Sequence, residues 1–249
     1  MAETEIEIPM SDGSCQAVLF HPEGKPGQRW PGVLYLTDIG GIRDANRKTA
    51  KQVADAGYVV LEPNVFYHTG RIPLEPNFRS LPPEDMKRRI AELSAPLTPE
   101  VMERDLSQYI DFLAAQPFVG QGTMGVVGFC FTGKMALHAA AARPEKISAA
   151  ASFHGGGLHT DQPTSPHLTL PRIKAQLYFG HAANDRSMPA EAIAKLEDAL
   201  QAWRGKYESE VYEGAAHSWT VPDSPVYNPL QAKRAFDKLV DLLRTTLQA

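Results

Sequence analysis

Apolar runs of strand length alternate along this chain with segments whose apolar residues recur every three or four positions. The strand-like runs are residues 32–37, 58–62, 123–127, 147–153, 173–179 and 207–212. The helix-like segments are residues 45–56, 99–115, 132–142, 189–203 and 228–247. This alternation predicts an α/β fold, in which a mostly parallel central sheet carries helices on both faces.

Two segments depart from this alternation. Residues 5–8 and 15–21 flank Ser11-Asp12-Gly13 and predict a β-hairpin before the parallel strands. Residues 64–99 are long, proline-rich and charged, with one short helix expected at 84–93, and loops of this length are often functional lids. No repeat or shift of composition divides the chain, so we expect one domain over residues 1–249 with a surface excursion at about 64–99.

A nucleophile pattern follows the run at 123–127, in Gly128-Phe129-Cys130-Phe131-Thr132-Gly133. A strand that turns sharply into a helix lifts the middle side chain out of the backbone, and the crowded turn favours small residues around it. Taken alone, a cysteine behind an apolar strand is as often a small buried hydrophobe. Cys130 therefore needs partners elsewhere in the chain before it can be read as a nucleophile.

The chain offers those partners in a recognisable order. Asp185 lies beyond the run at 173–179, and His217 lies beyond the run at 207–212. A thiol nucleophile needs a base, normally histidine, and a carboxylate that orients the base. The carboxyl ends of parallel strands meet at one edge of the sheet. We therefore predict a Cys130–His217–Asp185 triad there.

Two backbone N–H groups are expected to form an oxyanion hole beside this triad. One belongs to Phe131, directly after the nucleophile, where the N-terminus of the next helix also favours a thiolate. The other is expected from Ile39, in the loop after residues 32–37, because Gly40 and Gly41 let that backbone approach a substrate.

Composition narrows the classes of function and location. The 249 residues carry a net charge of -4 with no basic stripe or basic amphipathic segment, which argues against nucleic-acid and membrane partners. The acidic start of the chain lacks an apolar signal segment, and only Cys15 and Cys130 are cysteines, so we expect reduced thiols and a cytoplasmic location. Cys15, inside a predicted strand, is expected to be inert core.

Other motifs give weaker predictions. His154, His159 and His167 share a glycine- and proline-rich loop, but their spacing does not favour a zinc site. His181 is expected at a loop surface. Gly125 and Gly128 lack the third glycine and acidic partner of a dinucleotide loop. We therefore expect no metal and no organic cofactor.

Taken together, these motifs resemble the dienelactone hydrolase family of α/β-hydrolases over nearly the whole chain. The resembling segments are Gly-Phe-Cys-Phe-Thr-Gly-Lys around Cys130, Phe179-Gly180 with Asn184-Asp185 and Met188-Pro189, and Tyr212-Glu213-Gly214 with His217-Ser218. The resemblance implies an α/β-hydrolase fold and hydrolysis of an enol-lactone or related ester through a thioester on Cys130. It also implies a nucleophile-activating carboxylate at the position of Asp38, where the family usually has glutamate.

Three departures from the family bear on the substrate. Asp38 is one methylene shorter than glutamate, and Thr132 stands where the family commonly has glycine. No arginine follows His217 closely, although in the dienelactone-specific enzymes such an arginine binds the substrate carboxylate. A second family arginine comes from the excursion, where Arg71, Arg79, Arg88 and Arg89 are the candidates. These departures favour a small ester or lactone over dienelactone itself, with Trp219 and Phe66-Tyr67 as candidate walls of a more apolar pocket.

Two alternatives stay open. One is a carboxylesterase or thioesterase with a broader acyl pocket, which fits the missing arginine. The other is a non-catalytic α/β-hydrolase scaffold, which fits the departures at Asp38 and Thr132. The sequence does not indicate the oligomeric state.

Overall fold

One eight-stranded sheet organises the computed structural model, which describes residues 1–74 and 81–247. Its order is β1-β2-β4-β3-β5-β6-β7-β8, with β1, β2 and β4 joined antiparallel and all other neighbours parallel. The strands are β1 (Ala2–Met10), β2 (Gly13–His21), β3 (Gly32–Leu36), β4 (Val59–Pro63), β5 (Met124–Phe129), β6 (Ile147–Phe153), β7 (Gln176–Asn184) and β8 (Tyr207–Ala216). The prediction of a mostly parallel sheet behind an N-terminal hairpin is confirmed.

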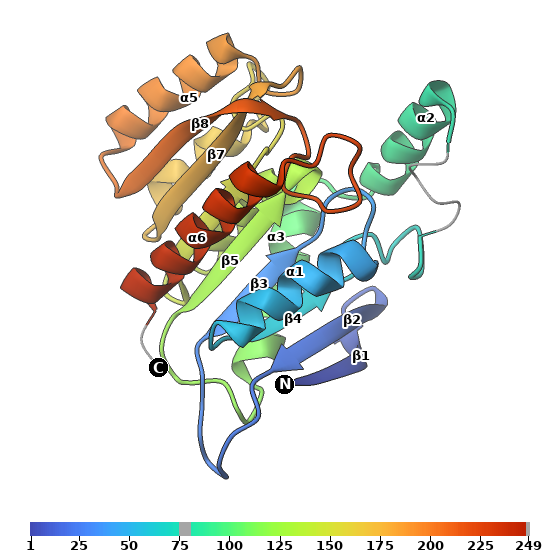
Figure 1. Ribbon diagram of the computed structural model, residues 1–249, viewed down its shortest axis with the longest axis vertical. Coiled ribbons are helices and arrows are strands. Elements are labelled where there is room, and N and C mark those ends of the chain that lie inside the picture. Colours follow the sequence, from blue (N-terminus) through green and yellow to red (C-terminus); the bar gives the residue numbers. More distant parts are fainter. Residues whose placement is uncertain (75–80, 248–249) are drawn as a thin grey trace.

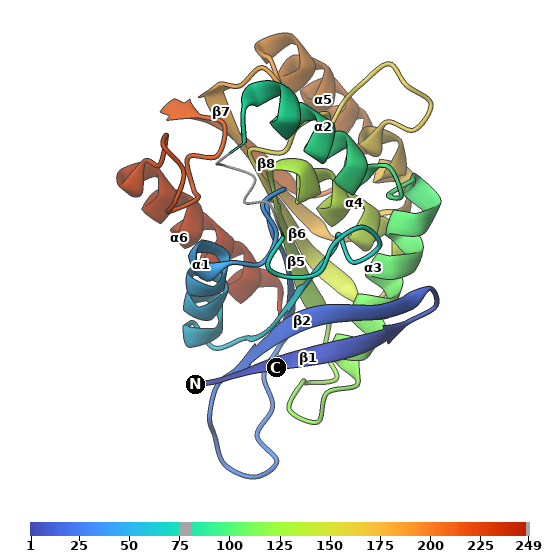
Figure 2. The same cartoon turned by 90° about the vertical axis from the view of Figure 1, so that its right-hand side faces the viewer.

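Helices cover both faces of the sheet, as predicted. They are α1 (Asp44–Asp55), α2 (Pro83–Ser94), α3 (Pro99–Ala114), α4 (Gly133–Ala142), α5 (Ala190–Trp203) and α6 (Pro229–Thr246). Figure 2 shows α1 and α6 on one side of the sheet and α3 and α4 on the other. The α2 helix stands apart from the sheet at the side of the molecule (Figure 1).

The sheet separates two hydrophobic layers. On one face, Val53 of α1 and Leu239 of α6 pack with the apolar side chains of the strands. On the other face, Leu106 of α3, Met135 of α4 and Leu196 of α5 do the same. Because parallel strands are buried on both faces, their sequences are nearly continuous apolar runs, which explains why the runs predicted them so well.

The structure differs from the predicted elements mainly around β7. This strand runs from Gln176 to Asn184, whereas the sequence predicted residues 173–179, because its apolar character fades after Phe179. His181 consequently lies inside the strand and only 2% exposed, so the prediction of a loop-surface histidine was wrong. In the long excursion, the short helix expected at 84–93 is α2. Residues 75–80, including Arg79, lie outside the described part.

The predicted functional residues all sit just beyond strand ends. Cys130 directly follows β5, Asp185 follows β7 and His217 follows β8, while Asp38 is the second residue after β3. These strands are parallel neighbours or near neighbours, so their carboxyl ends place the four loops at one edge of the sheet. Within the described ranges, no helix has the length and apolar character needed to cross a membrane. Whether the whole chain forms one domain stays a prediction.

Candidate active site

The elbow at Cys130 forces the nucleophile candidate into a left-handed backbone conformation. Its φ is +57°, a region that residues other than glycine rarely adopt. The turn is also tightly packed: a Cβ at Gly128 would lie 2.2 Å from the carbonyl oxygen of Thr132, and one at Gly133 would lie 2.6 Å from the Cα of Gly155. Glycine is therefore required on both sides of Cys130, which explains the small residues in the motif.

Thr132 fastens this elbow to the neighbouring strand. Its buried hydroxyl lies 2.9 Å from the Leu36 carbonyl oxygen and 3.0 Å from that of Phe129, and it accepts the Phe129 N–H at 2.9 Å. Leu36 is the last residue of β3, just before the loop that holds Ile39. Threonine therefore fits the elbow without disrupting it and ties it to the oxyanion loop, where glycine would provide no such contact.

The side chains of the predicted triad lie in hydrogen-bond contact. His217 Nε2 is 3.0 Å from Cys130 Sγ, and His217 Nδ1 is 2.6 Å from Asp185 Oδ2. The second oxygen of Asp185 accepts bonds from the N–H and the hydroxyl of Ser187, at 2.8 and 2.6 Å. The carboxylate is thus fixed from both sides, and it orients the imidazole so that Nε2 faces the thiol.

Electrostatics at the triad favour a charged histidine. Burial disfavours the imidazolium, yet the hydrogen bonds and charges of Asp185 and Cys130 raise the pKa of His217 to about 10. Burial likewise disfavours the carboxylate, but the bonds from His217 and Ser187 lower the pKa of Asp185. An imidazolium between a carboxylate and a thiol stabilises the thiolate, the form in which cysteine is nucleophilic.

A second histidine, His154, lies against the triad and was missed as a site residue. It follows β6 directly, its ring meets the His217 ring edge-on at 5.3 Å, and its Nε2 lies 2.7 Å from Thr220 Oγ1. Burial lowers the pKa of His154 well below its usual value, so the ring is neutral beside the cationic His217. Its position directly after a strand is the same signal that identified Asp185 and His217.

The two predicted oxyanion donors lie in suitable loops. Phe131 is the second residue of a 3-10 turn, Cys130–Thr132, so its N–H precedes the first bonds of that turn. Ile39 lies in the turn Asp38–Gly41, where Gly41 N–H donates to the Asp38 carbonyl at 3.0 Å. Among the described residues, no hydrogen bond has the Ile39 N–H as its donor.

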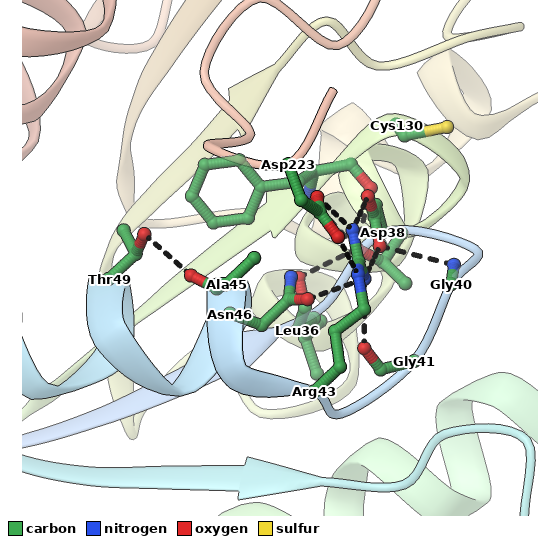
Figure 3. A network of polar contacts seen from close by, with 12 residues as sticks. Leu36, Asp38, Gly40, Gly41, Arg43, Ala45, Asn46, Thr49, Cys130 and Asp223 are labelled. Atoms are coloured by element: carbon green, nitrogen blue, oxygen red, sulfur yellow. Dashed lines mark hydrogen bonds and ion pairs between the residues drawn. The ribbon is translucent and has the colours of Figure 1, made fainter. Parts of the chain in front are cut away.

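The Asp38 side chain is held by Arg43 and by the neighbouring backbone. Its carboxylate takes two hydrogen bonds from the Arg43 guanidinium, at 2.6 and 2.9 Å, and one from the Gly40 N–H at 3.1 Å. Figure 3 shows the Cys130 sulfur pointing away from Asp38. Arg43 also pairs with Asp223, in the loop after His217, and neither residue stood out in the sequence.

Two of the aromatic residues proposed as pocket walls, Trp219 and Phe66, are fully buried. Trp219 packs against Tyr212 and His154 and has no exposed surface, so it does not serve as the predicted wall of a more apolar acyl pocket. Phe66 packs against Phe131, next to the elbow, at a ring distance of 5.9 Å. Phe66 is as fully buried as Trp219, so it too is a core side chain.

The loop histidines do not gather around a metal position. His159 and His167 stack on each other at 3.9 Å, while His154 belongs to the triad surroundings. In the part of the chain that the structure describes, no group of three or more histidine, cysteine or acidic side chains could hold a metal ion.

Comparison with known proteins agrees with this geometry. A profile of the dienelactone hydrolase family matches residues 15–247, which is most of the chain. This chain belongs to the dienelactone hydrolase family. Membership makes it an ester-hydrolysing enzyme of the α/β-hydrolase fold and confirms the resemblance seen in the motifs.

Relatives and structural neighbours extend over most of the chain. A carboxymethylenebutenolidase from Rhodococcus opacus is 30% identical over 198 residues, covering 78% of this chain and 73% of the relative. A dienelactone hydrolase-like promiscuous phosphotriesterase from metagenomic libraries superposes with a TM-score of 0.80 at 22% identity, with full coverage of both chains. A dienelactone hydrolase from Anabaena variabilis superposes with a TM-score of 0.70 at 19% identity, covering 99% of each. The structural likenesses establish the fold.

Proposed function

We propose that this enzyme hydrolyses a small carboxylic ester or enol-lactone through a thioester on Cys130. The observation that carries the proposal is the unbroken contact from Asp185 through His217 to Cys130, with distances of 2.6 and 3.0 Å. The raised pKa of His217, about 10, supports a resting thiolate–imidazolium pair. Family membership supports ester chemistry, and the strained elbow supports a presented nucleophile.

The reaction then follows from these three side chains. The Cys130 thiolate attacks the ester carbonyl carbon, and the Phe131 and Ile39 N–H groups stabilise the oxyanion. The intermediate collapses to a thioester, and the leaving alkoxide takes the proton from His217 Nε2. His217, now neutral, removes a proton from water as that water attacks the thioester. The acid departs and the thiolate–imidazolium pair is restored, with Asp185 orienting the imidazole throughout.

The charges near the site favour an uncharged substrate. No arginine follows His217 closely in the sequence. The N–H groups of Arg43 already donate hydrogen bonds to Asp38, Asp223, Gly41 and Asn46. The carboxylate of an anionic lactone such as dienelactone would therefore have to bind without an arginine after His217 and without the Arg43 guanidinium. A small neutral ester or lactone is therefore our first choice of substrate, and a carboxylesterase or thioesterase with a broader acyl pocket is the second. Because the mechanism needs a free thiol, we keep the cytoplasm as the predicted location.

Substitution of the nucleophile tests the proposal. Cys130→Ala should reduce hydrolysis of a neutral aryl ester to the background rate, because no thioester can form, while circular dichroism shows an intact fold. Cys15→Ala is the matched control, since Cys15 is a buried strand residue whose pKa is raised to about 12 by burial. Hydrolysis that survives in Cys130→Ala would overturn the mechanism.

Thiol labelling separates the enzyme from a non-catalytic scaffold. Iodoacetamide should label Cys130 rapidly, because the His217 imidazolium 3.0 Å away stabilises the thiolate. An activated ester should give a burst of one alcohol per chain. A scaffold would show slow labelling that rises only with ordinary thiol ionisation, and no burst.

Comparing dienelactone with neutral aryl esters ranks the two substrate classes. Much faster turnover of dienelactone would contradict the preference for an uncharged substrate.

A further inference from the structure

We propose that Arg43 is a positioning residue that clamps the oxyanion loop to the histidine loop, and that Asp38 serves this clamp rather than activating the thiol. The inference rests on the proposed thioester mechanism, because it assigns these residues a part in it. Figure 3 shows the Arg43 guanidinium between Asp38 on one side and Asp223 on the other.

The guanidinium holds both carboxylates with paired bonds. Nη1 and Nη2 donate to the two oxygens of Asp38 at 2.6 and 2.9 Å. Nε and Nη2 donate to the two oxygens of Asp223 at 2.8 and 3.0 Å. The flat, fork-shaped donor set of arginine suits two such contacts, and lysine cannot reproduce them. Each loop is therefore fixed in orientation as well as in distance.

On the oxyanion side, the contacts define the backbone around Ile39. Asp38 accepts the Gly40 N–H at 3.1 Å, and Arg43 Nη1 donates to the Gly41 carbonyl at 3.1 Å. Gly41 has a φ of +69°, which completes a tight turn with Ile39 as its second residue. The direction of the Ile39 N–H depends on the peptide between Asp38 and Ile39, so holding Asp38 holds this donor.

On the histidine side, Asp223 belongs to a loop that closes on itself. This loop leaves β8 with His217 and returns where the Asn228 N–H donates to the Trp219 carbonyl at 3.0 Å. Thr220, in the same loop, contacts His154 beside the triad. Arg43 thus joins the two loops that flank Cys130, one carrying an oxyanion donor and the other carrying the base.

The Asp38 side chain is far more buried than that of Asp223. The Asp38 side chain is 3% exposed, against 40% for Asp223, so the contact with the guanidinium stabilises a buried charge at Asp38. Guanidinium N–H groups donate to both Asp38 oxygens, so the carboxylate is held in one orientation by Arg43. A carboxylate held in this way orients a loop and does not serve as a base for Cys130.

The test compares Arg43→Met with Arg47→Met. Arg47 lies one turn further along α1 and pairs with Glu3 and Glu5 on β1, away from the triad, so it controls for the loss of an arginine ion pair. We expect Arg43→Met to lower kcat for ester hydrolysis by about 10- to 100-fold, since an oxyanion donor is misplaced, with little change in KM. Iodoacetamide labelling of Cys130 should keep its wild-type rate and pH profile, because alkylation needs the thiolate but no oxyanion hole. Arg47→Met should match the wild type in both assays.

Two further variants keep the proposal open to refutation if Arg43→Met fails to fold. Arg43→Lys keeps the charge and loses the paired bonds, and Asp223→Asn keeps the Asp38 pair while weakening the link to the histidine loop. Both should show a smaller loss of kcat, about 3- to 10-fold, with unchanged labelling. Wild-type kcat in these folded variants, or equal losses of kcat and labelling, would overturn the clamp. Hydrolysis that survives Cys130→Ala would instead overturn the proposed function, so the two failures are distinct.

Discussion

Asp185 and Asp38 are two buried carboxylates beyond strands of one sheet, and they differ in the cation that each one meets. Their side chains are 2% and 3% exposed, and each pairs with a basic side chain. Asp185 meets His217, whose other nitrogen faces the Cys130 thiol. Asp38 meets Arg43, which also holds Asp223.

The difference in partner decides what each carboxylate can do. Histidine gains and loses a proton near neutral pH, so a carboxylate that binds it can tune a proton transfer. Arginine keeps its proton, so this contact transfers none, and its paired donors fix the geometry of the carboxylate. Burial and position after a strand are therefore shared by Asp185, for which we propose a part in proton transfer, and Asp38, for which we propose a structural role. The partner has to be known before either role is assigned.

Among these carboxylate substitutions, the largest loss of activity is expected at Asp185. Asp185→Asn should lower kcat/KM for ester hydrolysis by about 10³- to 10⁴-fold, because an amide neither charges nor orients the imidazole correctly. It also removes the main group that raises the pKa of His217. Labelling of Cys130 should therefore become slow, and its pH profile should differ from that of the wild type.

The corresponding substitution of Asp38 should reduce activity much less. Asp38→Asn keeps an oxygen for the bonds from Gly40 and Arg43 but loses the charge. We expect kcat to fall by about 10-fold or less and the free energy of unfolding to fall by about 1–3 kcal/mol, measured by urea denaturation. The pH profile of Cys130 labelling should not move. A profile that shifts as far as that of Asp185→Asn would restore Asp38 as an activator of the thiol.

The sequence predicted the fold and the triad for the same physical reason. Parallel strands are buried on both faces, so they read as apolar runs, and the residues that follow them must lie at one edge of the sheet. Cys130, Asp185 and His217 each follow a run of this kind. His154 obeys the same rule, but it was grouped with the loop histidines because no partner for it was visible in the sequence.

The clamp could not be predicted in this way. Arg43 lies just before α1 and Asp223 lies inside a loop, 180 positions apart in the chain, and neither belongs to a periodic pattern. The position of Asp38 was identified, yet its partner depends on how two loops fold back over the sheet edge. Trp219 shows the same limit. It was a candidate wall of the acyl pocket, and the folded loop buries it completely.

Glu62 in β4 is a third buried carboxyl group. Among the described residues it has no cation in contact, unlike Asp185 and Asp38. The side chain is fully buried, and neither oxygen has a hydrogen-bond partner among the described residues. Burial raises its pKa from an ordinary 4.5 to about 8, although the charges of Arg47 and Arg43 oppose this. Burial therefore favours the neutral acid of Glu62.

Because the folded-state pKa of Glu62 lies above the unfolded value, its contribution to stability is complete below about pH 4.5 and is lost as the pH rises toward 8. Within that window, an unfolded chain ionises Glu62 while the folded chain keeps its proton. Glu62→Gln should remove this loss, so the stability of the variant relative to the wild type should rise with pH by up to about 1.4 kcal/mol per unit. Urea denaturation from pH 5 to 8 measures the difference, and Glu145→Gln at the exposed surface controls for losing one carboxyl group. Parallel curves for Glu62→Gln and wild type would show that Glu62 is ionised in the folded state. It would then require a cation in contact, as Asp38 and Asp185 do.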